Sequence, residues 1–86
     1  MNNWTLAYIG TTVRRLRKSR MKSQEALASE SSLDRRTIGK IENDQVIPKF
    51  TTFNSLACAF EMDPLELLEE VKKDIRRARM RKKEFE

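Results

Sequence analysis

The stretch from Gln24 to Glu42 constrains the fold more than any other part of the chain. Ile38 and Ile41 lie three residues apart in it, a spacing that places both on one face of a helix. Asp34 stands just before this helix, where its carboxylate can accept the unpaired N–H groups of the first turn. The apolar residues of the preceding segment and of the junction are Leu27, Ala28 and Leu33. The stretch therefore predicts two short helices joined by a tight turn.

Two adjacent arginines, Arg35 and Arg36, begin the second of these helices. The helix dipole favours acidic residues at that position, so an arginine pair there indicates a role outside the helix. A helix that enters the major groove of DNA makes base contacts from its N-terminal residues, and arginine can donate two hydrogen bonds to guanine. We interpret residues 35–43 as such a helix, with a simple solvated basic face as the alternative. The predicted base contacts are Arg35, Arg36, Thr37 and Lys40.

The chain from Ile9 to Leu68 resembles the lambda-repressor-like (Xre-type) helix-turn-helix family. The segments that carry the resemblance are SQEALA at 23–28, LDRRTIGKIEN at 33–43 and LACAF at 56–60. The resemblance implies an all-α fold, a compact five-helix bundle whose second and third helices bind DNA. Among the small regulators of this family, the LDRRTIGKIEN segment looks most like the controller proteins of restriction–modification systems.

The resemblance also implies roles for single residues around the two helices. Arg17 is expected to form a partly buried ion pair with Glu42 that orients the second helix, whereas a loose surface pair would contribute only ~0–1 kcal/mol. Ser23 is a good cap for the first helix, and the N–H groups that it leaves unpaired can meet a phosphate. The predicted phosphate contacts are Ser23, Gln24, Asn43, Gln45 and Lys49.

The chain departs from the family's pattern at three places where glycine is usual: Met21, followed by Lys22, before the capping serine, Ser32 in the turn, and Asp44 after the second helix. The turn position commonly needs a left-handed backbone, which costs a residue other than glycine ~1–2 kcal/mol. Two outcomes are open: Ser32 accepts this strain, or the turn is reshaped. A reshaped turn would tilt the second helix and change the predicted contacts.

Apolar spacing predicts two further helices of the bundle. The first runs from residue 2 or 3 to about residue 19, and Trp4 and Tyr8 are expected to close one end of the core. The fourth runs from residue 50 or 51 to about residue 61, with Cys58 interpreted as a core-filling side chain. The predicted buried stripes are Leu6, Ile9, Val13 and Leu16 in the first helix, and Phe53, Leu56, Ala57 and Phe60 in the fourth, which Phe50 can join.

The residues from Asp63 to Glu66 have the order of a helix start, with an aspartate cap, a proline and a glutamate. No helix breaker follows, so this extended C-terminal helix can run about twenty residues, or ~30 Å. Its apolar residues recur with the spacing of a short coiled coil, which favours a second copy of the chain as partner. We therefore divide the chain into a DNA-binding domain at 1–70 and a basic extension at 71–86, for which a frayed tail is the alternative. The predicted dimer contacts are Leu68, Val71, Ile75 and Ala78.

Composition argues against several other functions. The 86 residues make one domain, and the net charge of +5 fits a polyanionic partner. The chain has no histidine and one cysteine, which argues against a zinc site, a catalytic dyad and an internal disulfide. No apolar run approaches the ~20 residues of a membrane span, and no signal peptide is visible. We therefore predict a cytoplasmic protein that is not an enzyme and uses no cofactor or metal.

These observations predict a sequence-specific transcriptional regulator that binds a palindromic operator in double-stranded DNA as a homodimer. Two recognition helices related by a two-fold axis would contact half-sites ~34 Å apart. A contact with RNA polymerase or another partner protein is left open. The alternative function is an antitoxin-like DNA-binding and protein-interaction module whose C-terminal helix binds a partner protein.

Overall fold

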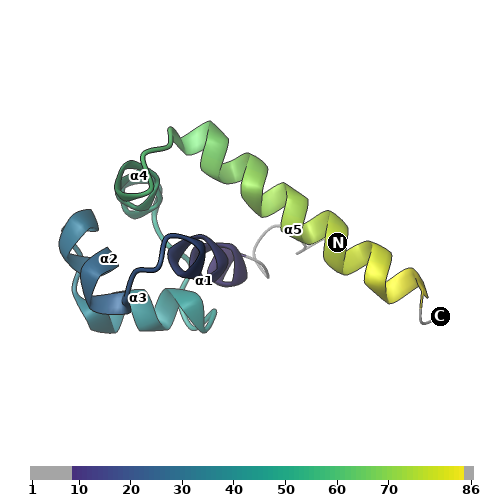
Figure 1. Ribbon diagram of the computed structural model, residues 1–86, viewed down its shortest axis with the longest axis horizontal. Coiled ribbons are helices and arrows are strands. Elements are labelled where there is room, and N and C mark those ends of the chain that lie inside the picture. Colours follow the sequence, from purple (N-terminus) through teal and green to yellow (C-terminus); the bar gives the residue numbers. More distant parts are fainter. Residues whose placement is uncertain (1–8, 85–86) are drawn as a thin grey trace.

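The structure is a computed structural model that describes the backbone of residues 9–84 and the side chains of residues 9–81. Five helices follow one another within that range, which confirms the predicted all-α architecture (Figure 1). Their bounds are α1 Ile9–Ser19, α2 Gln24–Ser31, α3 Arg35–Glu42, α4 Phe50–Ala59 and α5 Pro64–Glu84. The predictions for Trp4, Leu6 and Tyr8, and for the start of the first helix, lie outside the described residues.

Short polar side chains start three of the helices. Ser23 accepts a backbone N–H of α2 at 3.0 Å, and Asp34 accepts one of α3 at 2.7 Å. At the start of α5, Asp63 and Glu66 each accept the other's backbone N–H, at 2.9 and 3.0 Å. These bonds satisfy N–H groups that have no partner inside the helix. The three predicted caps are therefore confirmed.

Each of the first four helices is followed, within two residues of its end, by a left-handed residue that is not glycine. These residues are Met21, Ser32, Asp44 and Glu61, with φ between 55° and 58°. In each case the N–H of the following residue donates to the carbonyl five positions earlier, at 2.8–3.1 Å. This bond closes the helix end by satisfying a carbonyl that the helix leaves unpaired. Ser32 therefore accepts the left-handed conformation, and the turn between α2 and α3 keeps the expected shape.

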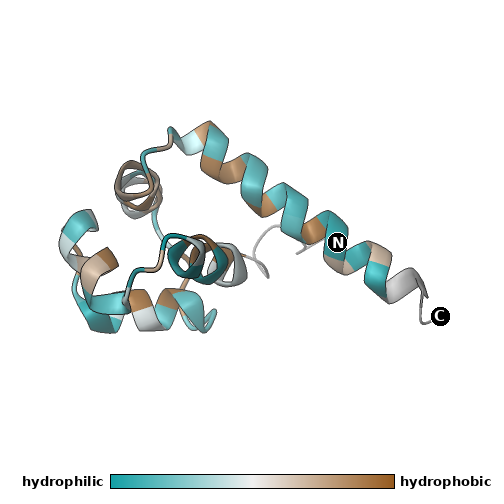
Figure 2. Ribbon diagram, in the orientation of Figure 1, coloured by the Kyte–Doolittle hydropathy of each residue, from teal (hydrophilic) through white to brown (hydrophobic). Residues whose placement is uncertain are grey.

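The core lies among the five helices and contains most of the side chains that the sequence predicted. Figure 2 shows hydrophobic residues alternating with hydrophilic ones on the helices, the pattern of amphipathic helices around one interior. Burial of each large apolar side chain contributes about 1.5–3 kcal/mol to stability. The residues of this core are Val13, Leu16, Leu27, Ala28, Ile38, Ile41, Leu56, Ala57, Ala59, Phe60 and Leu67. Ile9, Leu33, Phe53 and Met62 pack against it from partly buried positions.

Two predictions for α4 are wrong. Cys58 is exposed rather than core-filling, because the buried face of α4 is set by Leu56, Ala57 and Phe60, and Cys58 lies on the opposite face. Phe50 does not join the buried stripe and remains 73% exposed. It stands in the first turn of α4, at the edge of an open groove rather than inside the core.

The first half of α5 packs on the bundle of its own chain. Val71 and Ile75 are only 1% and 2% exposed, because α5 lies against α4 and α1. The prediction that these two residues face a second copy is therefore wrong. Leu68 and Ala78 do reach the surface, the first exposed and the second half-buried. Among the helices that the structure describes, none is long and apolar enough to cross a membrane.

Candidate nucleic-acid interface

α3 is anchored on one side and open on the other. Ile38 and Ile41 have almost no exposed surface and fix the helix on α1 and α2. The opposite side carries Arg35, Arg36 and Lys40, all of them exposed. The remaining predicted base contact, Thr37, is half-buried. The predicted base-contacting side chains thus lie on one element, with three of the four free to reach outward.

The Arg35 side chain is only loosely held. Its guanidinium lies 3.9 Å from the carboxylate of Glu25 on α2, and both side chains are largely exposed. A pair of this kind contributes about 0–1 kcal/mol. Arg35 can therefore exchange Glu25 for another acceptor at little energetic cost.

The far end of α3 is held by a buried ion pair. Arg17 on α1 donates two hydrogen bonds to the Glu42 carboxylate, at 2.7 and 3.0 Å. Gln24 at the start of α2 donates a third, at 3.1 Å. The Glu42 side chain is 0% exposed and that of Arg17 is 12% exposed, so this is the partly buried pair expected from the sequence rather than a surface pair. One carboxylate therefore connects α1, α2 and α3.

Both members of this pair stay charged near neutral pH. Burial acts to raise the pKa of Glu42, but the hydrogen bonds from Arg17 and Gln24 outweigh it and lower this pKa below the usual glutamate value. The hydrogen bonds that Arg17 donates to Glu42 raise the pKa of Arg17. The charged pair is consequently the form that fixes α3 over the physiological pH range.

α1 touches the end of α3 directly at Gly10, a residue that the sequence analysis missed. A Cβ at this position would overlap the carbonyl oxygen of Ile41 and lie 2.8 Å from that of Glu42. The Gly10 N–H donates to Oδ1 of Asp44 at 3.2 Å. Asp44, at the position where the resemblance led us to expect glycine, is thus tied to α1 by its side chain. A glycine inside a helix costs ~1 kcal/mol of stability relative to alanine. A glycine within a predicted helix therefore indicates a close contact, and this was the signal in the sequence that could have identified Gly10.

Arg14 adds a third contact at the end of α3. Its guanidinium donates to Oδ1 of Asn43 at 2.9 Å and to the Glu42 carbonyl at 3.5 Å. A cation at the C-terminal end of a helix is favourable because the last carbonyls carry partial negative charge. Asn43, a predicted phosphate contact, therefore has its side-chain oxygen bonded within the protein.

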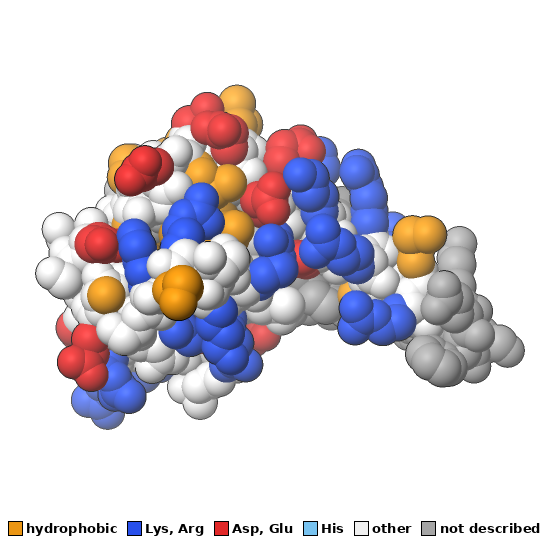
Figure 3. Space-filling view, in the orientation of Figure 1, with side chains coloured by type: hydrophobic (Ala, Val, Ile, Leu, Met, Phe, Trp, Pro, Cys, Tyr) orange, Lys and Arg blue, Asp and Glu red, His pale blue; other side chains and the backbone are white. Residues whose placement is uncertain are grey.

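The predicted phosphate contacts lie at the start of α2 and in the segment after α3. The bond between Gln24 and Glu42 brings the start of α2 beside the end of α3. Ser23 uses its hydroxyl to cap α2, and Gln24 uses its amide on Glu42. Asn43, Gln45 and Lys49 are exposed in the segment after α3. Figure 3 shows basic side chains along the lower edge of the molecule, where α3 lies, and along α5, whereas acidic ones gather near the start of α5.

Comparisons with known proteins agree with this geometry. The family model described as Helix-turn-helix matches residues 13–67. The restriction-modification controller protein C.AhdI from Aeromonas hydrophila is 37% identical, with a TM-score of 0.68 over 72% of this chain and 94% of that one. The wild-type restriction-modification controller protein C.Esp1396I shares the fold at 23% identity, with a TM-score of 0.76 over 86% of this chain and 95% of that one. A search of curated proteins found no match.

Proposed function

Since the chain belongs to the Xre-like helix-turn-helix family of DNA-binding regulators, we propose that it controls transcription by binding a palindromic operator as a homodimer. In this proposal α3 enters the major groove and the start of α2 meets the phosphate backbone. The observation that carries it is the position of Arg35, Arg36 and Lys40, exposed on a helix whose other face is locked into the core.

The chemistry of these side chains suits base recognition. Arginine can donate two hydrogen bonds to O6 and N7 of guanine, and each good pair contributes ~1–3 kcal/mol of discrimination against the wrong base. Thr37 can contact a thymine methyl group or a phosphate. A Cβ at Gly39 would meet nothing within 4 Å, so packing does not explain this glycine. Its absence of a side chain leaves room for DNA to approach the backbone.

The contacts at the end of α3 support tight and selective binding. Every group that must become ordered on binding lowers the affinity, because its conformational freedom is lost. The Arg17–Glu42 pair and the Gly10–Asp44 contact fix α3 before DNA arrives. The remaining ordering cost falls on the side chains that contact DNA.

An open apolar groove supports a second copy as the partner. It has a volume of about 290 Å³ and lies where α4, the start of α5 and the start of α1 meet. Phe50 and Leu65 at its rim are each 73% exposed. Exposed apolar patches of this kind mark interaction sites, and a two-fold axis would place the same groove on both copies. The residues that line it are Ile9, Pro48, Phe50, Phe53, Pro64, Leu65 and Leu68.

Selection of bound sequences from random DNA tests the operator. We expect a palindrome whose half-sites lie ~34 Å apart. Arg35→Ala and Arg36→Ala should each relax the preference at single base positions, whereas Lys49→Ala should weaken binding to all sequences alike. Selected DNA without two-fold symmetry, or unchanged preference in both arginine variants, would contradict the proposal.

Sedimentation equilibrium tests the dimer independently of DNA. Leu65→Asp places a charge in the groove and should weaken self-association by about 2 kcal/mol, or roughly thirtyfold. Met80→Asp, which changes an exposed apolar residue outside the groove, is the matched control. Equal effects of the two variants would show that the groove does not form the interface.

A further inference from the structure

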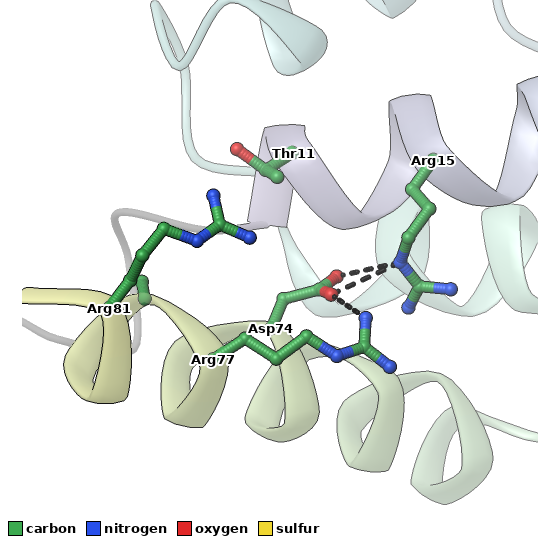
Figure 4. A pocket seen from close by; sticks show the side chains of 6 residues that line it. Thr11, Arg15, Asp74, Arg77 and Arg81 are labelled. Carbon is green, nitrogen blue, oxygen red and sulfur yellow. Dashed lines mark hydrogen bonds and ion pairs between the residues drawn. The ribbon is translucent and has the colours of Figure 1, made fainter. Parts of the chain in front are cut away.

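A second cavity, lined mainly by charged residues, lies between α1 and the distal part of α5, away from the exposed face of α3. Its volume is about 230 Å³ (Figure 4). Three of the side chains around it carry guanidinium groups, and one carries a carboxylate. The lining residues are Thr11, Arg15, Asp74, Arg77, Ala78 and Arg81.

The carboxylate of this cavity is already fully engaged. Asp74 is buried, and its Oδ1 accepts from Arg77 at 3.0 Å and from Nε of Arg15 at 3.1 Å. Its Oδ2 accepts from the Thr12 hydroxyl at 2.7 Å and from the same Nε at 3.1 Å. Two guanidinium groups therefore neutralise Asp74, and its lone pairs point at donors of the protein rather than into the cavity.

Arg15 is also held from the other side by Glu70, at 2.8 Å. Burial acts to lower the pKa of Arg15, but the hydrogen bonds to Glu70 and Asp74 outweigh it and raise this pKa. Glu70 in turn accepts from Lys73 at 3.0 Å. This network contains two carboxylates and three cationic side chains, so it already carries a net positive charge before the last arginine of the cavity is counted.

Arg81 is that last arginine, and it has no acceptor among the described residues. In Figure 4 its side chain extends from α5 across the cavity, with the guanidinium between Thr11 and Asp74. Thr11 is exposed at the opposite wall, on α1. A guanidinium carries five N–H donors in a planar fork, and Arg77 uses one of its own on Asp74. The cavity therefore has unused donors on two helices and an uncompensated positive charge.

We propose that this cavity binds a phosphate group, which Arg81 and Arg77 hold from α5 and the Thr11 hydroxyl meets from α1. The arginine fork matches the geometry of phosphate oxygens and gives short, charge-assisted hydrogen bonds. The Asp74 network fixes Arg77 and Arg15 in place behind the ligand. The phosphate can belong to a free phosphorylated molecule or to the DNA backbone, and only the second source rests on the function proposed above.

The first arm of the test uses pyrophosphate and the full chain, by calorimetric titration at constant ionic strength. The wild type should show saturable binding, and Arg81→Gln should weaken it about tenfold. Arg76→Gln is the matched control, because it removes the same charge from an exposed position of the same helix outside the cavity. It should change the affinity less than about twofold, because exposed charges are screened.

The second arm measures operator affinity against salt concentration. If a backbone phosphate occupies the cavity, Arg81→Gln should lower the slope of log K against log salt by about 0.9, and Arg76→Gln should leave the slope unchanged. An Arg81-specific effect in the first arm assigns a free ligand, and one in the second assigns DNA. Equal behaviour of the two variants in both arms overturns the proposal, because diffuse positive charge would then account for the binding. If no operator is found, equal behaviour of the two variants in the first arm alone overturns it.

Discussion

The end of α3 and the distal half of α5 both carry many charges, yet they are fixed in different ways. At the end of α3 the Glu42 carboxylate is buried and receives hydrogen bonds from two other helices. Among the α5 side chains that the structure describes, the last buried apolar one is Ile75, and the arginines beyond it are exposed. Asp74 connects this part of α5 to α1 through Thr12 and Arg15.

The difference shows where the molecule needs fixed geometry. A buried ion pair resists displacement, because loss of one partner leaves a charge without compensation. An exposed arginine is solvated and screened, and it contributes little to stability. Substitutions at the end of α3 should therefore change the stability of the fold, whereas substitutions of exposed arginines on α5 should change interactions with partners.

The largest expected effect comes from Arg17→Ala. It leaves the Glu42 carboxylate buried without its main donor and should lower the free energy of unfolding by about 3–5 kcal/mol. Arg76→Ala on α5 should change it by no more than about 0.5 kcal/mol. Urea denaturation of both variants measures the contrast. Similar losses in the two variants would remove the distinction between the regions.

The two glycines of the chain give a smaller and sharper test. Gly10→Ala should destabilise the fold by about 1–3 kcal/mol, because the new methyl group meets backbone carbonyls of α3 that cannot move independently. Gly39→Ala should stabilise the DNA-free protein by up to ~1 kcal/mol, because it improves helix propensity and meets no neighbour. Thermal unfolding of both variants measures the difference. Changes of the same sign would mean that the α1–α3 contact is not as close as described.

The smallest expected effect is a dependence of stability on pH. The pKa of Glu42 is lowered in the folded state, so its contribution is present above the value in the unfolded chain, about 4.3, and is lost as the pH falls through the folded value. Unfolding measured between pH 7 and pH 3 should show this loss, which Glu42→Gln should reduce. Glu25→Gln, at a largely exposed position, should keep the wild-type profile. An unchanged profile in Glu42→Gln would contradict the assigned role.

Local features of the fold were predictable from the sequence. The caps at Ser23, Asp34 and Asp63 depend on residues that lie within one helical turn of one another, so they could be identified without knowing the tertiary structure. The same holds for the start and length of α5. The Arg17–Glu42 pair joins residues far apart in sequence, and it was predictable only through the family resemblance.

Features set by the angle between helices were not predictable. The spacing of Val71 and Ile75 indicated an apolar stripe on α5 but not which surface would cover it. The corner between α4 and α5 decides this, since it places the stripe on the chain's own bundle and leaves Phe50 and Leu65 at the groove. The cluster around Asp74 joins α5 to the beginning of α1, and nothing local in the sequence distinguished Asp74 from a solvated acid.

The left-handed helix ends have a consequence for the lifetime of the protein in a cell. Four such residues without glycine cost about 1 kcal/mol each, which is a sizeable part of the 5–15 kcal/mol that separates most native proteins from their unfolded chains. A smaller margin increases the fraction of molecules open to proteases at any moment. We therefore expect Ser32→Gly to slow degradation, so that the wild-type chain is cleared faster than this variant once synthesis stops.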